Sequence, residues 1–354
     1  MTSINPTIAV RADEGLDESR LLGFLRQHFS DLKKPLEVSQ FPSGRSNLTY
    51  LLSFPNRHLV LRRPPHGTKA KTAHDMLREF TFMHALKPHF EALPQVFLHC
   101  SESDVIGSEF FVMEAVPGEL IHNVIPETWD WDSEDIRAFC LSFWDRLIAL
   151  HSVNLQHLEL GSYARPDGYV ERQVKGWSKR YTNAQTPDAP NCDRLVRWLL
   201  ERMPGDGKPA VLHNDFRIDN VILDARNPMQ IRAVLDWEMA AVGNPLMDLG
   251  NSLAYWTEAR DGEEALKAAS QPSASPGMLT RQEVIDYYAT QTGQDVAGIE
   301  FYYVYGLFRL AGIIQQIYYR YYHGQTSDPR FDGWVREVWR LVDRCEKVIA
   351  GDRF

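Results

Sequence analysis

The 354-residue chain has only four cysteines, no long apolar run and no excess of positive charge. The cysteines lie far apart, with no CxxC pair and no histidine at the spacing of a zinc site, so we expect reduced, buried thiols. The longest apolar runs, such as 310–314, fall far short of the roughly 20 residues that span a bilayer. These absences predict a protein without a disulfide framework, a zinc site or a membrane partner.

The amino terminus also lacks the pattern of an export signal, because residues 1–15 are polar and mixed in charge. We therefore expect a cytoplasmic protein. The formal net charge is −9, whereas binding to a nucleic acid duplex depends mainly on lysines and arginines that neutralise phosphates. Nucleic acid is thus excluded as a partner, but an anionic small ligand is not, because a local group of basic side chains can set the field inside one cleft.

The length and the 44% hydrophobic content suit two domain-sized units of a globular protein. After an amphipathic helix at 17–29, short aliphatic and β-branched segments separated by turn signals predict an antiparallel meander. Strands are expected at 36–41, 48–54, 58–63, 95–100 and 110–115, with a helix at 72–86.

The break at Pro117-Gly118 is followed by a part of the chain whose long patterns are mainly helical. Helices are expected at 134–151, 169–182, 193–203, 282–292, 300–322 and 332–350. Two short strands, at 221–223 and 231–235, interrupt these helices. The whole pattern predicts an α+β protein in which a small sheet precedes a helical unit.

Polar and charged side chains gather within residues 211–224, between two apolar stretches, which is costly unless those groups have partners or a function. Asp215 and Asn220 lie in this segment, and Asp236 directly follows the strand expected at 231–235. Phosphoryl transfer needs a carboxylate that orients the attacking hydroxyl, and oxygen ligands that hold magnesium against the nucleotide phosphates. These three side chains could supply that set.

Two motifs here resemble those of the aminoglycoside phosphotransferase family of kinase-like enzymes. Residues 213–220, HNDFRIDN, match the family's H-G-D-x-x-x-x-N loop, and residues 235–238, LDWE, match its I/L-D-[WFH]-E segment. The resemblance implies a bilobal protein-kinase-like fold, with an antiparallel-sheet nucleotide-binding lobe at 1–116 and a mainly helical catalytic and acceptor-binding lobe at 117–354. It also implies ATP- and Mg²⁺-dependent transfer of the γ-phosphate to a hydroxyl of a small molecule.

By the same resemblance Asp215 is the catalytic base, and Asn220 and Asp236 are the metal ligands. Asn214 departs from the family pattern, which usually has glycine there. Where a backbone position requires a positive φ, asparagine is the least costly replacement for glycine. We therefore expect the loop geometry to be kept.

The resemblance extends to two further nucleotide-binding segments. The turn with Ser43 and Gly44 stands where backbone amides would cover the phosphates. The segment from Glu114 to Val116 stands in the hinge, where backbone groups would bind adenine. Each segment, taken alone, is also what an ordinary turn or the end of a strand looks like.

The lysine that grips the α- and β-phosphates in kinases is replaced here by arginine. We assign that position to Arg62, with Arg63 as the alternative, and its acidic partner to Glu79. Arginine stays charged and binds phosphate oxygens in a fork, so the replacement is compatible with activity.

Several runs resemble the kinase-like domain that is fused to certain acyl-CoA dehydrogenases, which implies a hydroxyacyl-CoA acceptor. The runs are SNLTY at 46–50, VLRRPP at 60–65, REF at 78–80, DVIG at 104–107 and FRIDN at 216–220. Aromatic and basic residues could line such an acceptor site, although aromatics at helical spacing are more often core. These residues are Tyr302, Tyr303, Tyr305, Phe308, Arg309, Arg320, Trp177, Lys179 and Arg180.

Three other functions remain open at this point. An antibiotic kinase for polycationic aminoglycosides would use acidic residues near Trp256, namely Glu258, Asp261, Glu263 and Glu264. A nucleotide-binding pseudokinase would explain the replaced lysine and glycine. A metal-dependent hydrolase or nuclease could be built on Asp215, Asp219 and Asp236.

Three polar residues of this region also have ordinary structural interpretations. Asp219 is typical of a residue that orients a loop or caps a helix, and His213 is typical of structural support. Asp248 is expected to tie the loop that holds the metal to a helix.

Overall fold

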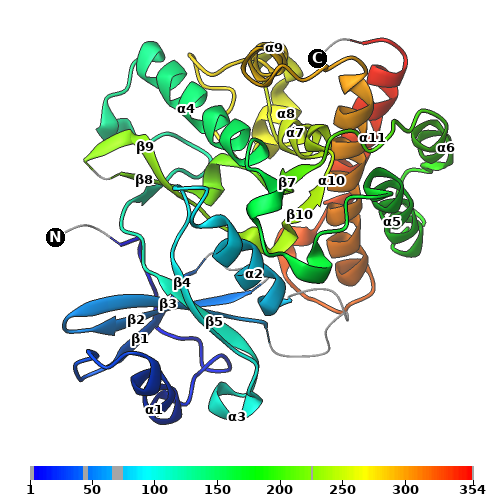
Figure 1. Ribbon diagram of the computed structural model, residues 1–354. Helices are drawn as coiled ribbons and strands as arrows, with labels where there is room; N and C mark the ends of the chain where they lie inside the picture. Colours follow the sequence, from blue (N-terminus) through cyan, green and yellow to red (C-terminus); the bar gives the residue numbers. More distant parts are fainter. Residues whose placement is uncertain (1–3, 43–46, 66–74, 225, 353–354) are drawn as a thin grey trace. The chain divides into compact units, whose positions relative to one another are not determined.

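The computed structural model describes residues 4–42, 47–65, 75–224 and 226–352 (Figure 1). The chain forms two compact units. Unit 1 consists of Met1–Leu120, His157–Gly161 and Asn220–Ala240, and unit 2 consists of Ile121–Gln156, Ser162–Asp219 and Ala241–Phe354. The segment 220–240, which carries Asn220 and Asp236, therefore belongs to the same unit as the amino-terminal sheet.

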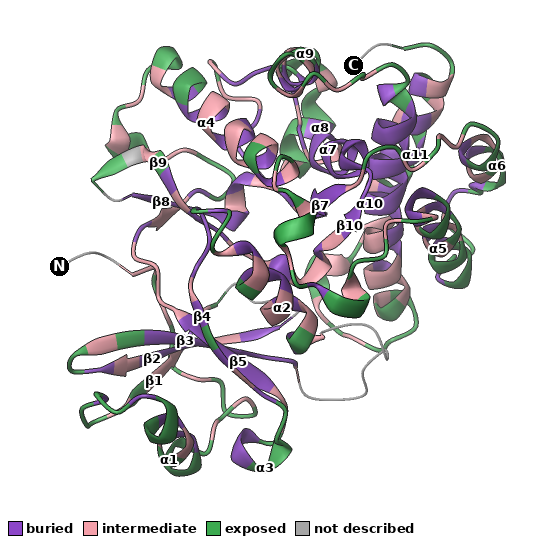
Figure 2. Cartoon of the chain, viewed as in Figure 1, coloured by how far each residue is buried: buried purple, intermediate pink, exposed green. Residues whose placement is uncertain are grey.

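The core of unit 1 is an antiparallel sheet with strand order β1-β2-β3-β5-β4. Its strands are β1 (Glu37–Gln40), β2 (Leu48–Phe54), β3 (Arg57–Arg63), β4 (Val96–Cys100) and β5 (Phe110–Glu114). The predicted meander is confirmed, because β1, β2 and β3 pair in sequence order. The central strands β3 and β5 are almost continuously buried, as Figure 2 shows for β5.

Helices pack against this sheet. In α1 (Glu18–His28), Asp17 caps the first turn by accepting from Arg20 N, and Leu21 and Leu25 are fully buried in the core. The helix α2 (Met76–Leu86) begins after Asp75, whose side chain accepts from Arg78 N. The buried face of α2 is apolar except for Glu79, which is only 1% exposed. A buried carboxylate on an otherwise apolar face indicates a specific partner.

Unit 1 also contains a smaller sheet of three strands, β6 (Glu119–Leu120), β8 (Val221–Asp224) and β9 (Asn227–Val234), in the order β6-β8-β9. Gly118 has φ of 154°, and a Cβ there would lie 2.0 Å from the carbonyl oxygen of Leu223. Glycine is therefore required where the chain passes β8, because any side chain would collide with the backbone.

Unit 2 is mainly helical. Its helices are α4 (Ser133–His151), α5 (Tyr169–Asn183), α6 (Asp193–Glu201), α7 (Pro245–Ala254), α8 (Glu263–Ala268), α9 (Arg281–Thr292), α10 (Ile299–Tyr322) and α11 (Val335–Ile349). The long helix α10 packs against α5, α7 and α11 and is buried along most of its length (Figure 2). Close approach of α7 and α10 depends on small residues, because a Cβ on Gly306 would lie 2.2 Å from the Gly250 carbonyl oxygen.

The antiparallel amino-terminal sheet and the helical remainder confirm the predicted fold class. All four cysteines are free and buried, as predicted. No helix within the described ranges is both long enough and apolar enough to cross a membrane. The sequence reasoning missed α7 and the short pair β7 (Ala210–Leu212) and β10 (Ala241–Gly243).

Candidate active site

The two predicted metal ligands lie at the same end of the β8–β9 hairpin. Val221, the first residue of β8, pairs with Val234, the last residue of β9. Asn220 and Leu235 therefore flank the same edge, and Leu235 N donates to the Asn220 carbonyl at 2.8 Å. Asp236 follows directly, so local strand pairing brings both predicted ligands to one edge of unit 1.

The backbone of Asp236 is left-handed, with φ of 66° and ψ of 60°. This conformation costs a non-glycine residue roughly 1–2 kcal/mol and persists only where neighbouring contacts enforce it. The indole of Trp237 donates to the Val234 carbonyl at 2.8 Å, and Arg78 Nε donates to the Ala240 carbonyl at 3.1 Å. The loop that carries Asp236 is thus held at both ends.

Arg62 lies among three carboxylates. Its Nε is 3.2 Å from Glu79 Oε2, its Nη2 forms an ion pair with Asp236 Oδ1, and the same nitrogen is 3.7 Å from Glu238 Oε2. Asn47 Nδ2 donates to Glu238 at 2.8 Å. Arg63 instead points away, with Nη1 donating to the Ile106 carbonyl at 3.2 Å. Arg62 is therefore the arginine beside Glu79 and the predicted metal ligand.

Burial dominates the electrostatics of this group. Burial raises the pKa of Glu79 to about 7, against the opposing effect of the Arg62 charge. Burial disfavours the charge of Arg62, but Glu79, Asp236 and Glu238 outweigh that effect and raise its pKa. Arg62 is therefore shared among three carboxylates, of which Glu79 is only partly charged near pH 7.

The donor set of unit 1 fits magnesium. The ion prefers oxygen ligands, and in nucleotide enzymes it takes only one or two from the protein, with the rest from water and phosphates. Asp236 offers a carboxylate and Asn220 an amide oxygen at the same edge. No group of three or more histidine, cysteine or acidic residues that could hold a metal occurs in the described part of the chain. Asn220 and Asp236 are the residues that would hold such an ion.

The remaining nucleotide-binding predictions concern the hinge and the turn. Glu114 N donates to the Gln95 carbonyl at 2.8 Å, and Glu114 Oε2 accepts from Gln95 N at 3.1 Å. The amide and side chain of Glu114 are thus used within unit 1, and adenine binding there would depend on the Glu114 carbonyl and on Val116. Ser43 and Gly44 lie outside the described residues.

In unit 2, the loop that carries Asp215 is anchored to α7 by a buried carboxylate. Asp248 accepts from His213 N at 2.6 Å and from Asn214 N at 2.7 Å, and His151 Nε2 lies 3.3 Å away. Asp215 N in turn donates to His213 Nδ1 at 3.2 Å. His213 supports the loop as predicted. Asp248 is a residue of α7 whose two oxygens accept from the 213–214 backbone, so it ties this loop to a helix.

Asn214 has φ of 64°, which confirms the left-handed backbone predicted where the family has glycine. Its side-chain oxygen accepts from Tyr169 Oη and Asn251 Nδ2, both at 3.1 Å. Asparagine is thus tolerated because its strain is offset by hydrogen bonds that glycine could not form.

Asp215 is partly exposed and lies beside a cation. Arg217 Nε is 3.5 Å from Asp215 Oδ1, and Arg217 Nη2 donates to Asp219 Oδ2 at 2.9 Å. The Arg217 guanidinium also lies over the ring of Tyr255, 4.8 Å from its centroid. Burial raises the pKa of Asp219, against the effect of Arg217. Asp219 is therefore the nearer partner of Arg217, and Asp215 lies partly exposed beside the same guanidinium.

Replacing Asp248 with asparagine should lower both stability and any turnover. The amide keeps one acceptor oxygen and points NH₂ at the other backbone N–H, so at least one charge-assisted hydrogen bond is lost, at about 2–3 kcal/mol. Urea unfolding and steady-state kinetics would measure these losses. The exposed Asp286→Asn variant serves as the matched control, and wild-type stability for Asp248→Asn would contradict the anchoring role.

Six of the residues considered for an acceptor site form two groups. Tyr302, Tyr303 and Phe308 are buried in the helical core, which is the alternative that helical spacing favours for aromatic residues. Tyr302 hydroxyl accepts from Asn244 at 3.0 Å, and Phe308 packs on Tyr181. By contrast, Trp177, Arg180 and Arg309 do come together, because both guanidiniums lie over the Trp177 ring, at 4.7 and 5.4 Å.

The acidic residues near Trp256 are largely neutralised within unit 2. Arg281 forms ion pairs with Asp261 at 2.5 Å and Glu258 at 3.5 Å, and Arg260 pairs with Glu258 at 2.5 Å. Glu263 pairs with Lys267 on the surface at 2.7 Å. This region thus offers little uncompensated negative charge to a polycation.

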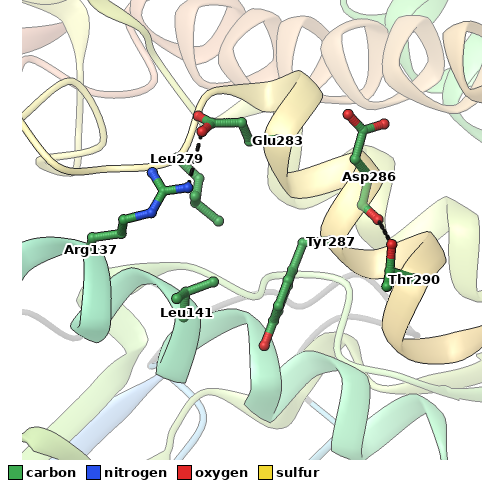
Figure 3. Close-up of a pocket in the computed structure, with 7 residues that line it drawn as sticks. All are labelled: Arg137, Leu141, Leu279, Glu283, Asp286, Tyr287 and Thr290. Atoms are coloured by element: carbon green, nitrogen blue, oxygen red, sulfur yellow. Dashed lines mark hydrogen bonds and ion pairs between the residues drawn. The ribbon is translucent and has the colours of Figure 1, made fainter.

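A cavity of about 270 Å³ lies between α4 and α9 (Figure 3). Arg137 and Leu141 reach it from α4, and Tyr287 reaches it from α9 (Figure 3). An exposed ion pair between Arg137 and Glu283, at 3.1 Å, lies at its edge. None of the predicted site residues lines this cavity.

The fold and the two polar loops define a kinase-like protein, and comparison with solved structures agrees. A protein from Ralstonia eutropha, provisionally assigned as an aminoglycoside phosphotransferase, has a TM-score of 0.72 and 27% identity, covering 93% of this chain and 99% of that one. Choline kinase from Cryptosporidium parvum has the same fold, with a TM-score of 0.62 and 14% identity over 95% of this chain and 98% of that one.

Residues 37–283 match the phosphotransferase enzyme family, so the chain belongs to that family. It is also 33% identical to human acyl-CoA dehydrogenase family member 11 over 320 residues, which cover 88% of this chain and 40% of that protein. The chain thus spans less than half the length of this curated relative.

The sequence reasoning assigned no role to Arg217, Tyr255, Asn47 or Arg78. Arg217 could have been found, since its place two residues after Asp215 puts a cation in the same loop. Tyr255 follows the end of α7, and its contact with Arg217 depends on a helix that the pattern did not reveal.

Proposed function

We propose that this chain is an ATP- and Mg²⁺-dependent phosphotransferase that transfers the γ-phosphate to a hydroxyl of a small molecule, with a hydroxyacyl-CoA as the acceptor. The single observation that carries the proposal is the Arg62 group in unit 1. This group consists of the buried Arg62 guanidinium, its buried acidic partner Glu79, and Asp236, whose backbone is left-handed. Phosphate and metal binding would use these three side chains together.

We assign a role to each predicted catalytic residue and metal ligand. Asp215 orients the acceptor hydroxyl and takes its proton, while Arg217 places a positive charge beside the transferred phosphoryl group. In the transfer, a bond forms from the acceptor oxygen to the γ-phosphorus and the bond to the β-phosphate oxygen breaks, which releases ADP. Asn220 and Asp236 would hold the metal ion, which when bound neutralises phosphate charge.

Two observations support the acceptor class, namely the pairing of acidic side chains in unit 2 and the similarity to a named relative. The acidic side chains Glu258 and Asp261 are paired with arginines, which disfavours a polycationic aminoglycoside. The relative at 33% identity is named as an acyl-CoA dehydrogenase family member, which favours an acceptor derived from acyl-CoA. The pairing of Arg62 with Glu79 favours a working phosphate site over a pseudokinase.

The test is ADP release from ATP, with and without Mg²⁺, against 4-hydroxyacyl-CoA, aminoglycosides, choline and simple sugars. We expect only 4-hydroxyacyl-CoA to stimulate ADP release, and chelation of the metal to stop it. Stimulation by an aminoglycoside would replace the proposed acceptor. ATP binding without ADP release in any arm would favour a pseudokinase.

A further inference from the structure

Arg309 on α10 is a buried cation with an unusual environment. The side chain is only 3% exposed, and its Nη1 is buried without a hydrogen-bond partner in the described part of the chain. Among the ion pairs between described residues, none includes Arg309, and its ring contact is with Trp177 at 5.4 Å. A buried charge without hydrogen bonds opposes folding, so its retention calls for a function.

The surroundings of Arg309 connect it to the proposed catalytic loop. Tyr255, Tyr305 and Asp215 lie within electrostatic range of its guanidinium. Tyr255 also carries Arg217 over its ring at 4.8 Å, and Arg217 lies 3.5 Å from Asp215. Arg309 and Asp215 therefore influence each other electrostatically within unit 2, although no ion pair joins them.

A second guanidinium, that of the exposed residue Arg180, lies on the same aromatic ring as Arg309. Arg180 lies over the Trp177 ring at 4.7 Å and is exposed, whereas Arg309 over the same ring is buried. Three guanidiniums of unit 2 thus lie on aromatic rings, that of Arg217 on Tyr255 and those of Arg309 and Arg180 on Trp177. Such a group repels a polycation and attracts an acceptor that carries negative or strongly polarised oxygens.

We propose that Arg309 binds an acyl oxygen of the acceptor, a carboxylate or a thioester carbonyl located a few bonds from the hydroxyl. This inference rests on the proposed function and makes Arg309 the residue that selects hydroxyacyl compounds over other alcohols. A guanidinium donates several hydrogen bonds in a fixed plane, which suits an acyl oxygen better than a hydroxyl. The buried Nη1 is the donor that this contact would satisfy.

The test replaces Arg309 with methionine and compares three acceptors, namely a 4-hydroxyacyl-CoA, the free 4-hydroxy acid and the 1,4-diol of equal length. We expect kcat/KM for the two acyl acceptors to fall about 10- to 100-fold, the range for a lost hydrogen bond to a charged group. The diol and the KM for ATP should change little. Arg309→Lys should recover part of the loss, and the exposed Arg197→Met is the matched control. Comparing the acid with the thioester shows which acyl oxygen is bound.

Thermal stability separates this role from a structural one. Replacing a buried, unpaired arginine with an apolar side chain of similar length should leave the melting temperature unchanged or raise it. A lower melting temperature together with equal losses for all three acceptors would overturn the inference and identify Arg309 as a structural residue.

Failure of the inference can be told from failure of the proposed function. If wild type phosphorylates an acceptor and Arg309→Met treats acyl and diol acceptors alike, only the inference fails. If none of the acceptors stimulates ADP release by wild type, the proposed function fails. Calorimetric binding of 4-hydroxyacyl-CoA to wild type and Arg309→Met then decides the inference. Weaker binding by the variant supports it, and equal binding overturns it.

Discussion

Asp215→Asn is expected to reduce kcat for phosphoryl transfer by about 10²- to 10⁴-fold, the contribution typical of a general base. The amide has nearly the same shape but cannot take the hydroxyl proton. Because the change removes no proposed nucleotide contact, the affinity for ATP should stay close to that of wild type. Single-turnover ADP formation and equilibrium nucleotide binding would measure the two quantities separately.

The fold should tolerate this substitution. Arg217 keeps its 2.9 Å hydrogen bond to Asp219, and the loop keeps its anchor on Asp248. The exposed Asp286→Asn variant, in the same unit, controls for the chemical change and should behave like wild type. Wild-type turnover by Asp215→Asn would remove Asp215 from the mechanism.

Arg62→Met is the second substitution with a large expected effect. It should lower both the free energy of unfolding and the nucleotide-dependent activity. Breaking a buried ion pair from one side costs about 3–5 kcal/mol, because the partner is left as an uncompensated charge. Glu79, at 1% exposure, is that partner. We expect the lower end of this range, since Glu79 can take up a proton. Loss of a charge-stabilising donor should also reduce kcat/KM for ATP by about 10²-fold or more.

The pH dependence of this loss identifies its cause. With a pKa of about 7, folded Glu79 binds protons more tightly than the unfolded chain, whose carboxyl has the ordinary value of 4.5. Its contribution to stability therefore falls as the pH rises from about 5 to above 7. Without Arg62 the pKa of Glu79 rises further, so the destabilisation should be larger at pH 8 than at pH 6. Urea unfolding at the two pH values would measure it.

A double variant completes this test. Arg62→Met combined with Glu79→Gln removes both charges and should recover most of the stability but none of the activity. The exposed Arg26→Met on α1 is the matched control. Equal destabilisation at both pH values, or no recovery in the double variant, would contradict the pairing as the source of the effect.

The sheet and most helices were predictable because local patterns agree with the final fold. The meander β1–β2–β3 is visible as aliphatic runs separated by turns, and α1 and α4 have clear apolar stripes. The helix α7 was missed because its buried residues include Asp248, Asn251 and Ser252, so burial there does not follow a run of apolar side chains. Strands of three residues, such as β7 and β10, are too short to show any period.

The candidate site was predictable where its functional residues lie close together in the sequence. Asp215, Asn220 and Asp236 belong to two short segments with a recognisable spacing, and Glu79 could be matched to Arg62 through the family pattern. The buried environment of Arg309 and the anchor at Asp248 depend on helix packing between distant segments. Side-chain packing of this kind leaves no period or motif in one sequence.

The central claim is phosphoryl transfer to an acceptor hydroxyl, and ³¹P NMR of the products tests it most directly. Wild-type protein with ATP, Mg²⁺ and 4-hydroxyacyl-CoA should yield ADP and one new phosphate ester in equal amounts, and Asp215→Asn should yield neither at a comparable rate. ADP accompanied only by inorganic phosphate would contradict the account and identify a hydrolase. Unchanged ATP, despite measurable nucleotide binding, would identify a protein that binds the nucleotide without transferring its phosphate.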